Sequence, residues 1–336
     1  MTTIFVYEYC CATGLGREPS DPAHSLFREG RAMRDALAAD FARRPGTRVV
    51  VSGLPDGADG VDDEVAFRTH SAEADWSVVI APESRGLLEE RYSWARAVGA
   101  RVLGPSPGAV ARTTNKLTLA AEWQAAGVPT PDTRPVDAWP AGRFPCVIKP
   151  FDGAGSFATF LTCDDNEFAE SVRVATLEGE PAGRLIAQDY VPGRAASIAF
   201  MVGPTGALPL LPTFQRLSHD GRFRYEGGVF PISPNLAGRA VDLGRRAIAG
   251  IHGLFGYVGV DLVLGAAADG SADRAIEINP RFTTSYIGLR TLANTNLADL
   301  LLRVARGENV SPPVWKAGRA SFGADGSVSY AASSDT

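Results

Sequence analysis

Two apolar segments in the C-terminal part of the chain, residues 257–264 and 274–279, are joined by a connector rich in Gly, Ala and Asp. Short apolar runs separated by turn residues predict a hairpin of two adjacent antiparallel strands. The first strand carries Asp261, and the second carries Glu277 and Asn279 two positions apart. Because side chains alternate across a strand, Glu277 and Asn279 are predicted to project from one face of the hairpin.

This face of the hairpin would hold two carboxylates and an amide. Oxygen ligands of this kind suit a hard cation such as Mg²⁺ where it bridges a protein to phosphate groups. The alternative is an ordinary amphipathic hairpin with solvent-facing polar residues, and for Asp261 alone both interpretations stand. A merely exposed hairpin face does not require the Asn-Pro-Arg sequence at residues 279–281, which favours the cation site.

The composition and net charge exclude some classes of protein. The chain has 336 residues, of which 45% are hydrophobic and 21% charged, enough for two or three packed units. The net charge of −5 and the lack of a Lys/Arg block argue against a nucleic-acid partner. No apolar run reaches membrane-spanning length, so we expect no membrane partner and a cytoplasmic protein.

Cysteine and histidine contribute no recognisable site. The four cysteines lack metal-site spacing and are expected to be reduced thiols, namely Cys10, Cys11, Cys146 and Cys163. The four histidines are scattered and are expected at the surface or in packing, namely His24, His70, His219 and His252.

Strand-like and helix-like segments alternate over the first 110 residues. The predicted strands are residues 4–7, 48–51 and 76–80, and the predicted helices are residues 22–43, 62–74 and 84–98. This alternation predicts a small parallel α/β layer of the doubly wound kind. Gly14 and Gly16 follow the first strand, but the third glycine and the acid of a dinucleotide fingerprint are not at the expected spacing, which disfavours a dehydrogenase.

A lysine ends the apolar strand predicted at residues 145–150, directly before a Gly/Ser turn at residues 153–156. This arrangement suits phosphate binding, because glycines let backbone N–H groups approach an anion and the ammonium group adds positive charge. A plain hairpin with an exposed lysine is the alternative. Residues 185–193 predict a further strand that could face the edge of a flat heterocycle, or could simply be an edge strand. A helix is predicted at residues 292–306, and the tail after residue 311 is expected to be partly mobile.

The order of motifs along residues 112–306 resembles that of the ATP-grasp superfamily. The set comprises Asn115-Lys116, Val147-Ile148-Lys149-Pro150, Gly153-Ala154-Gly155-Ser156, Gln188-Asp189-Tyr190-Val191-Pro192-Gly193, Asp261 and Glu277-Ile278-Asn279-Pro280-Arg281. The resemblance implies an ATP-grasp fold, of α/β and α+β class, with an N-terminal parallel α/β domain. The implied divisions are the pre-ATP-grasp domain at residues 1–110, a small lid and linker subdomain at residues 111–184, and a C-terminal domain with the metal-binding hairpin at residues 185–336.

The resemblance also implies which residues bind the nucleotide. The phosphates of ATP would be held by Lys116, Lys149, Gly153, Gly155 and Ser156. The adenine hinge would be formed by Gln188, Asp189, Tyr190 and Val191. The chain departs from the family pattern in two places, because residues 194–197 lack the acid that often binds ribose and because position 188 is more often Glu.

For catalysis, the resemblance implies a substrate carboxylate that attacks the γ-phosphorus of ATP and an amine that then displaces phosphate from the acyl phosphate. Asp261, Glu277 and Asn279 would bind two Mg²⁺ ions, with Mn²⁺ as an alternative and Glu277 as the bridging ligand. Arg281 would face the transferred phosphoryl group beside Lys149. No protein nucleophile is required, which agrees with the lack of a Ser/His/Asp or Cys/His constellation in the sequence.

Within the superfamily, three segments resemble the tyramine–glutamate or tyrosine–glutamate ligases of methanofuran and methylofuran biosynthesis. They are Phe5-Val6-Tyr7-Glu8-Tyr9 with Ala12-Thr13-Gly14, Glu29-Gly30-Arg31-Ala32-Met33, and residues 279–288. The resemblance implies that the γ-carboxylate of glutamate is joined to tyrosine or tyramine, with these small molecules as partners. A homodimer is one alternative for the oligomeric state. The acceptor side would be lined by Glu8, Tyr9, Thr283, Thr284 and Ser285.

Alternatives remain open at this point. Thr283, Thr284 and Ser285 could instead cap the following helix. The enzyme could act on another amino-acid pair or carry out N-carboxylation, and the fold could be a nucleotide-binding module without turnover. The presence of Lys149 together with both metal-binding acids favours turnover, because a pure binding module would not need them.

Overall fold

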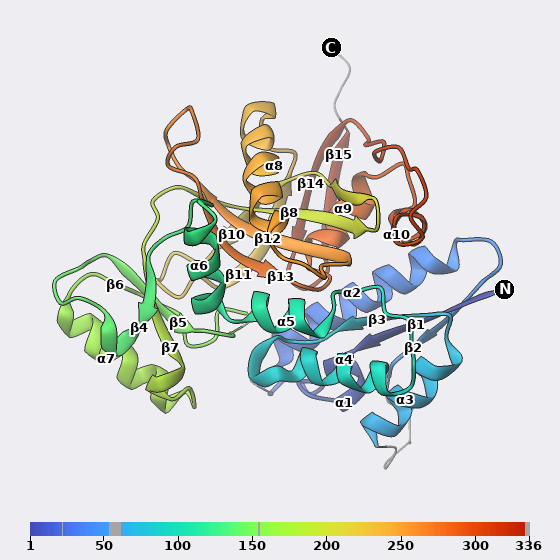
Figure 1. Ribbon diagram of the computed structural model, residues 1–336, viewed down its shortest axis with the longest axis horizontal. Helices are drawn as coiled ribbons and strands as arrows, with labels where there is room; N and C mark the ends of the chain where they lie inside the picture. Colours follow the sequence, from blue (N-terminus) through green and yellow to red (C-terminus); the bar gives the residue numbers. More distant parts are fainter. Residues whose placement is uncertain (22, 54–61, 154, 333–336) are drawn as a thin grey trace.

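The computed structural model describes residues 1–21, 23–53, 62–153 and 155–332, and this part of the chain forms three β-sheets (Figure 1). The N-terminal sheet has three parallel strands in the order β2-β1-β3. These strands are β1 (Thr2–Glu8), β2 (Thr47–Val51) and β3 (Trp76–Ile80). The helices of this unit are α1 (Tyr9–Thr13), α2 (His24–Ala42), α3 (Asp63–Glu73) and α4 (Leu87–Ala97).

Alternation along β1 explains why helices cover both faces of this sheet. Ile4 and Val6 share a buried cluster with Leu37 of α2, whereas Phe5 shares another with Phe67 of α3. A strand that is apolar on both sides is typical of a parallel sheet between helical layers. The predicted parallel α/β domain is therefore confirmed.

The second sheet is small and antiparallel, with strand order β4-β7-β5-β6. Its strands are β4 (Thr133–Pro135), β5 (Cys146–Pro150), β6 (Phe160–Thr162) and β7 (Leu185–Asp189), and α7 (Asp165–Leu177) packs on it. Helices α5 (Pro107–Thr114) and α6 (Lys116–Ala125) connect the N-terminal unit to this sheet. Because β7 pairs with β4 and β5, we propose a subdomain boundary after residue 189 rather than before residue 185.

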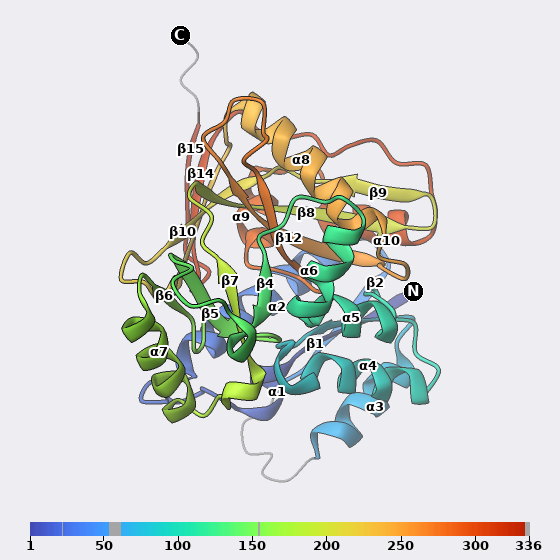
Figure 2. The same cartoon turned by 60° about the vertical axis from the view of Figure 1, so that its left-hand side comes forward.

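The third sheet is the largest, with strand order β13-β12-β8-β10-β11-β14-β15 and β9 paired to β8. Its strands are β8 (Arg194–Gly203), β9 (Gly206–Pro209), β10 (Thr213–Leu217), β11 (Tyr225–Phe230), β12 (Gly256–Leu264), β13 (Arg274–Asn279), β14 (Gly318–Gly323) and β15 (Val328–Ala332). Helix α8 (Pro234–Ala249) covers one face of this sheet, and α9 (Ser285–Leu292) and α10 (Leu297–Ala305) lie on the other side (Figure 2).

The C-terminal region differs from the sequence prediction in two places. Within the tail after residue 311, which is predicted to be partly mobile, β14 pairs with β11 and buries Ala320 and Phe322. The Gly, Arg and Ser residues of β14 conceal the alternation of a strand. The helix expected at residues 292–306 is instead two helices, because Ala293 is extended at the end of α9 and Asn296 caps α10 with its side chain.

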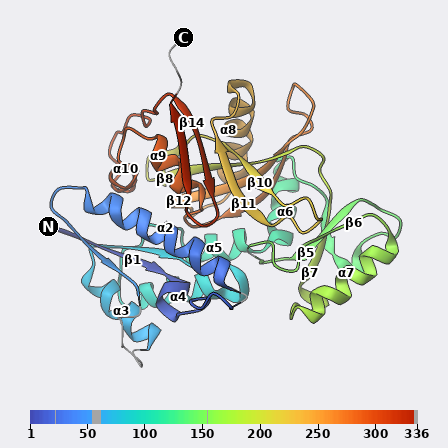
Figure 3. The ribbon, with the colours of Figure 1, turned by 180° about the vertical axis from the view of Figure 1, so that it is seen from behind.

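Helix α2 joins the N-terminal unit to the large sheet, since it packs against both α9 and α10 (Figure 3). Asp40 of α2 is fully buried, and its carboxylate accepts hydrogen bonds from the Tyr286 hydroxyl at 2.8 Å and from Arg290 Nε at 2.8 Å. Such a buried and fully paired carboxylate fixes the position of α2 over the C-terminal domain. Among the described residues, no helix is long and apolar enough to span a membrane.

Candidate active site

The predicted hairpin is formed by β12 and β13, and it brings the three proposed metal ligands together. In the antiparallel register, Asp261 lies opposite Glu277, and Gly259 lies opposite Asn279. A shift in the register follows Asp261, so the strand is irregular where the carboxylate projects. Irregularities of this kind re-aim side chains at functional sites.

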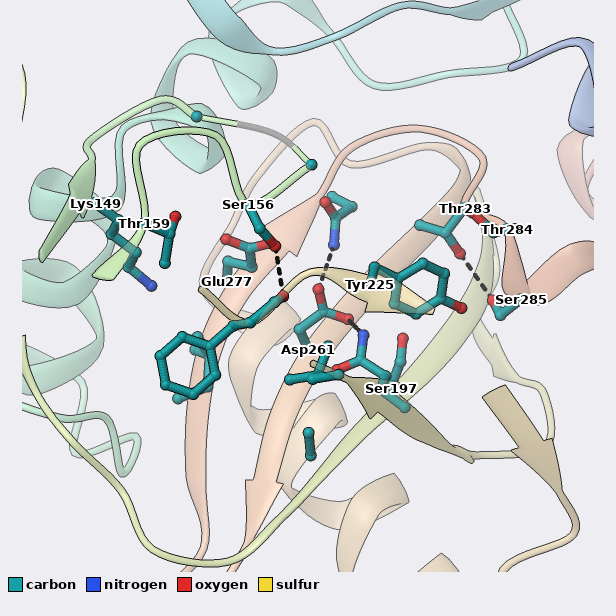
Figure 4. Close-up of a pocket in the computed structure, with 18 of the residues that line it drawn as sticks. Lys149, Ser156, Thr159, Ser197, Tyr225, Asp261, Glu277, Thr283, Thr284 and Ser285 are labelled. Atoms are coloured by element: carbon teal, nitrogen blue, oxygen red, sulfur yellow. Dashed lines mark hydrogen bonds between the residues drawn. The ribbon is translucent and has the colours of Figure 1, made fainter. Parts of the chain in front are cut away.

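Asp261 is held by two amide side chains. Gln215 Nε2 donates to Oδ1 of Asp261 at 3.0 Å, and Asn279 Nδ2 donates to Oδ2 at 3.1 Å (Figure 4). Burial, together with the negative charge of Glu277, raises the pKa of Asp261 to about 7. Two carboxylates that repel one another in a buried site would be stabilised by an added cation.

Two lysines face this pair of carboxylates from other parts of the chain. Asn115 caps helix α6 with its side chain and so places Lys116 at the helix start, where its Nζ lies 3.1 Å from Oε2 of Glu277 and 2.8 Å from the Gly153 carbonyl oxygen. Lys149, at the end of β5, projects into the same space (Figure 4). Burial lowers the pKa of Lys149 to about 8, although the carboxylate of Glu277 acts in the opposite direction.

These groups lie in a cavity of about 640 Å³ between the small sheet, the large sheet and the N-terminal unit. One end is lined by the residues predicted to bind the nucleotide, namely Lys116, Lys149, Gly153, Gly155, Ser156, Gln188, Asp189, Tyr190 and Val191. Its other end is lined by Glu8, Leu26, Glu29, Met33, Ile80, Tyr225, Thr283, Thr284 and Ser285. Asp261, Glu277, Asn279 and Arg281 lie on its wall as well. The volume is within the range of small-molecule sites in proteins.

Two of the residues predicted to form the adenine hinge already use their side chains in hydrogen bonds within the protein. Gln188 donates from Nε2 to the Thr133 hydroxyl at 2.8 Å, and Asp189 accepts from Arg143 Nε at 2.8 Å. The side-chain nitrogen of Gln188 and the carboxylate of Asp189 therefore fix the strand. At the expected ribose position, Arg194 lies over the ring of Phe214, 3.4 Å from its centroid.

The glycine-rich loop is tied to the large sheet. Ser156 Oγ donates to the carbonyl oxygen of Phe223 at 2.6 Å (Figure 4). Gly155 has a φ of +66°, which favours glycine at this position. Residue 154 lies outside the described residues. The Phe223 ring in turn stacks on Tyr190, with 6.4 Å between the centroids, so loop and hinge meet at this residue.

Arg281 lies on the cavity wall, but its guanidinium is paired with the N-terminal unit. Its Nε lies 2.8 Å from Oε1 of Glu83, and a second nitrogen donates to Oε2 at 2.9 Å. Glu83 follows β3 and is buried. The ion pair therefore fixes the segment after β13 to the N-terminal unit, in addition to any contact that Arg281 makes with a ligand.

Two of the predicted acceptor-side residues, Glu8 and Tyr9, do not present a free functional group to the cavity. Glu8 lines it, but its carboxylate accepts from the backbone N–H groups of Cys10 and Cys11 and caps α1. Tyr9 does not line the cavity, since it packs beside Arg91 in the N-terminal core. The structure thus gives Glu8 a capping contact and places Tyr9 outside the cavity wall.

The three hydroxyl residues after Arg281 do line the cavity. Thr284 occupies the cap position of α9 without a side-chain capping bond, and its hydroxyl donates to Glu29 instead. The Ser285 hydroxyl lies 2.8 Å from that of Thr283 and 3.0 Å from that of Tyr257. The alternative of helix capping is therefore wrong for the Thr284 side chain.

The donor set fits Mg²⁺ bound together with a phosphate ligand. Within the described ranges, no three His, Cys, Asp and Glu side chains form a metal cluster. The site instead offers the carboxylates of Asp261 and Glu277 and the amide oxygen of Asn279, whose nitrogen is turned toward Asp261. Mg²⁺ in nucleotide sites uses one or two carboxylates and completes its shell with phosphate and water.

Sequence reasoning gave no role to three residues that the fold brings into contact with the site. Gln215 holds Asp261, Glu83 holds Arg281, and Glu29 accepts from Thr284. Glu29 and Thr284 are 255 positions apart, so no local pattern could pair them. The one available signal was the segment around Glu29, which formed part of the resemblance but had no assigned function.

Comparison with known families identifies the class. An ATP-grasp domain model matches residues 113–285, and a pre-ATP-grasp domain model matches residues 52–110. The chain belongs to the ATP-grasp family. Its fold, with the N-terminal parallel domain followed by the two sheets that enclose the cavity, is the ATP-grasp fold.

Individual relatives define the reaction class. Tyramine–L-glutamate ligase of Methanocaldococcus jannaschii is 27% identical over 91% of this chain and 90% of its own length, and that of Methanocaldococcus fervens is 25% identical over 92% and 96%. The protein is an ATP-dependent carboxylate–amine ligase. The biotin carboxylase domain of Hydrogenobacter thermophilus 2-oxoglutarate carboxylase, solved with MgADP, shares the fold, with a TM-score of 0.66, 15% identity and coverage of 95% of this chain and 73% of that one. ATP-grasp enzymes use ATP and Mg²⁺.

Proposed function

We propose that the protein joins the γ-carboxylate of glutamate to the amino group of tyramine or tyrosine, in the biosynthesis of a furan cofactor of the methanofuran or methylofuran type. The similarity to tyramine–L-glutamate ligases spans more than nine-tenths of the chain. The observation that carries the proposal is the single cavity that connects a lysine and carboxylate end to a hydroxyl-lined end. Such a cavity can hold ATP and an acceptor at the same time.

At the nucleotide end, Lys116 and Lys149 bind the phosphates of ATP under the glycine-rich loop, and the strand at residues 188–191 borders the adenine. Asp261, Glu277 and Asn279 would hold the two expected Mg²⁺ ions, for which Mn²⁺ is expected to substitute. Bound Mg²⁺ offsets the negative charge of the phosphates. The lysines lie beside both carboxylates, so charge in the site is balanced when cation and nucleotide are both present.

The reaction has two steps. An oxygen of the γ-carboxylate attacks the γ-phosphorus, and the bond to ADP breaks, which gives an acyl phosphate. The amine, after its ammonium form has lost one proton, attacks the acyl carbon and expels phosphate, and the nitrogen loses a second proton, which leaves with the phosphate, as the amide forms. Lys149 and Arg281 stabilise negative charge on the transferred group, while the buried cavity keeps water from the acyl phosphate.

The test is a product assay with ATP, Mg²⁺, glutamate and a panel of amines. We expect ADP and a γ-glutamyl amide, identified by mass spectrometry, only when both glutamate and tyramine or tyrosine are present. Aspartate in place of glutamate, and omission of the amine, are the matched controls. ADP formation with a different amino-acid pair would replace the proposed substrates, and tight ATP binding without ADP under every acceptor would identify a binding module. Size-exclusion chromatography with light scattering tests whether the chain forms a homodimer.

A further inference from the structure

Helix α2 presents one face to the acceptor end of the cavity. Leu26, Glu29 and Met33 all line it, and their spacing of three and four residues places them on one side of a helix. Glu8 packs directly against Gly30, the residue after Glu29. The contact is so close that a Cβ at position 30 would lie 2.2 Å from Oε1 of Glu8. The close approach of β1 therefore fixes how α2 is turned, and Glu29 with it.

Glu29 has one polar partner in the described structure, the hydroxyl of Thr284, and no ion pair there. Burial raises its pKa, against the lowering effects of Thr284 and of the Arg281 charge. Arg281 itself is already bound to Glu83 at 2.8 Å. A partly buried carboxylate with a single hydroxyl donor is unfavourable unless a cation joins it, which is the role that a bound substrate can fill.

The surroundings of Glu29 suit an ammonium group with an apolar body. Tyr225 lines the same cavity, and Figure 4 shows its ring beside Thr283 and Ser285. An aromatic ring and hydroxyl oxygens are common partners of an ammonium group.

Apolar side chains form another part of the wall of this end. Leu26 and Met33 flank Glu29, and Ile80 at the end of β3 lines the cavity too. Leu26 also reaches the phosphate-side loop, because its Cδ2 would lie 3.2 Å from a Cβ at Gly155. A ligand bound at Glu29 is therefore next to the glycine-rich loop and not in a remote pocket.

We propose that Glu29 binds the ammonium group of the incoming amine, while the wall formed by Leu26, Met33 and Ile80 packs against the hydrocarbon part of that amine. This inference rests on the proposed function, because it assigns one of the two substrates to this end of the cavity. Glutamate suits the wall less well, since it carries a second carboxylate and little apolar surface. Glu29 is thus a specificity determinant for a cationic amine.

The direct test is calorimetric titration of tyramine into the full chain in the presence of Mg²⁺ and a non-hydrolysable ATP analogue. Glu29→Gln keeps the shape and removes the charge, so the dissociation constant is expected to rise about tenfold to hundredfold. Glu29→Asp, which keeps the charge, is expected to retain much of the affinity. Asp35→Asn is the matched control, because Asp35 lies on the same helix, half exposed, and pairs with arginines outside the cavity.

A neutral analogue of tyramine, in which a hydroxyl replaces the amine, should bind wild type and Glu29→Gln equally. Failure of tyramine to bind the wild type, or equal weakening in Glu29→Gln and Asp35→Asn, would overturn the inference. A rise in the KM for glutamate with an unchanged KM for the amine would overturn it as well. Formation of γ-glutamyl hydroxamate by the wild type with hydroxylamine, which is uncharged at neutral pH, reports glutamate activation separately. Absence of the hydroxamate would count against the proposed function. If the hydroxamate forms but the binding tests fail, only the role of Glu29 is refuted.

Discussion

Each charged group at the proposed nucleotide end of the cavity is positioned by the helix or strand that carries it. The acceptor end is instead formed where the N-terminal and C-terminal units meet. Lys149 ends one strand and Glu277 lies on one hairpin, so each is placed by its own element. Glu29 and Glu83 instead meet their partners across an interface. The comparison teaches that the groups proposed to bind phosphate and cations lie in short motifs, while the proposed acceptor site depends on how α2 and the end of β3 dock.

The largest expected effect tests the nucleotide end alone. Glu277→Ala removes one of the two carboxylates and the partner of Lys116, and we expect kcat to fall by about 10³-fold or more. Circular dichroism and thermal unfolding should show a folded protein, because the side chain projects into the cavity rather than into a core. Activity retained with Mg²⁺ would remove Glu277 from the metal site.

The next prediction sharpens the electrostatic description of that end. Because burial lowers the pKa of Lys149 to about 8, the free enzyme loses this positive charge as the pH rises through about 8. The value of kcat/KM for ATP should be highest below that pH and then decline by roughly tenfold per unit above it. Lys149→Arg, which stays charged, should lack this decline. A profile that is the same in both proteins would contradict the assignment.

A third prediction concerns the ion pair between Glu83 and Arg281, which joins the two units at the acceptor end. Glu83→Gln leaves the buried guanidinium of Arg281 without its anion, and we expect the free energy of unfolding to fall by about 3 kcal/mol in urea titration. Glu64→Gln is the control, since Glu64 pairs with Arg68 at the surface and its loss should cost less than about 1 kcal/mol. If both variants lose the same stability, the ion pair does not hold the two units together.

The smallest effect concerns the contact between the glycine-rich loop and the large sheet. Ser156→Ala removes the hydrogen bond to the Phe223 carbonyl, worth about 1 kcal/mol, so the KM for ATP should rise about fivefold with kcat nearly unchanged. Ser93→Ala removes a similar bond on the exposed surface of α4 and should leave KM unaltered. An unchanged KM for ATP in Ser156→Ala would show that this contact does not hold the loop over the nucleotide.

Most of the fold could be predicted because its signals are local. The apolar runs of β1 and β3 and the turn chemistry between β12 and β13 depend on neighbouring residues alone, and the structure confirms them. β10, β14 and β15 were not predicted, because polar or small residues interrupt their apolar pattern and pairing with neighbouring strands determines them. The sequence also did not predict that Glu8 caps α1, because a Glu at the end of a strand is no signal for a short helix directly after it.

By itself the sequence determined the hairpin that carries Asp261 and Glu277, and the lysine that ends the small-sheet strand, because a period of two and a turn are set by residues close together in the chain. Only the tertiary structure decided that Arg281 pairs with Glu83 and that Glu29 meets Thr284. Those contacts join residues about 200 positions or more apart. The contact of Glu29 also requires that α2 docks on α9 and α10, where the buried carboxylate of Asp40 pairs with Tyr286. Side-chain packing across an interface, rather than any local pattern, therefore sets the acceptor end.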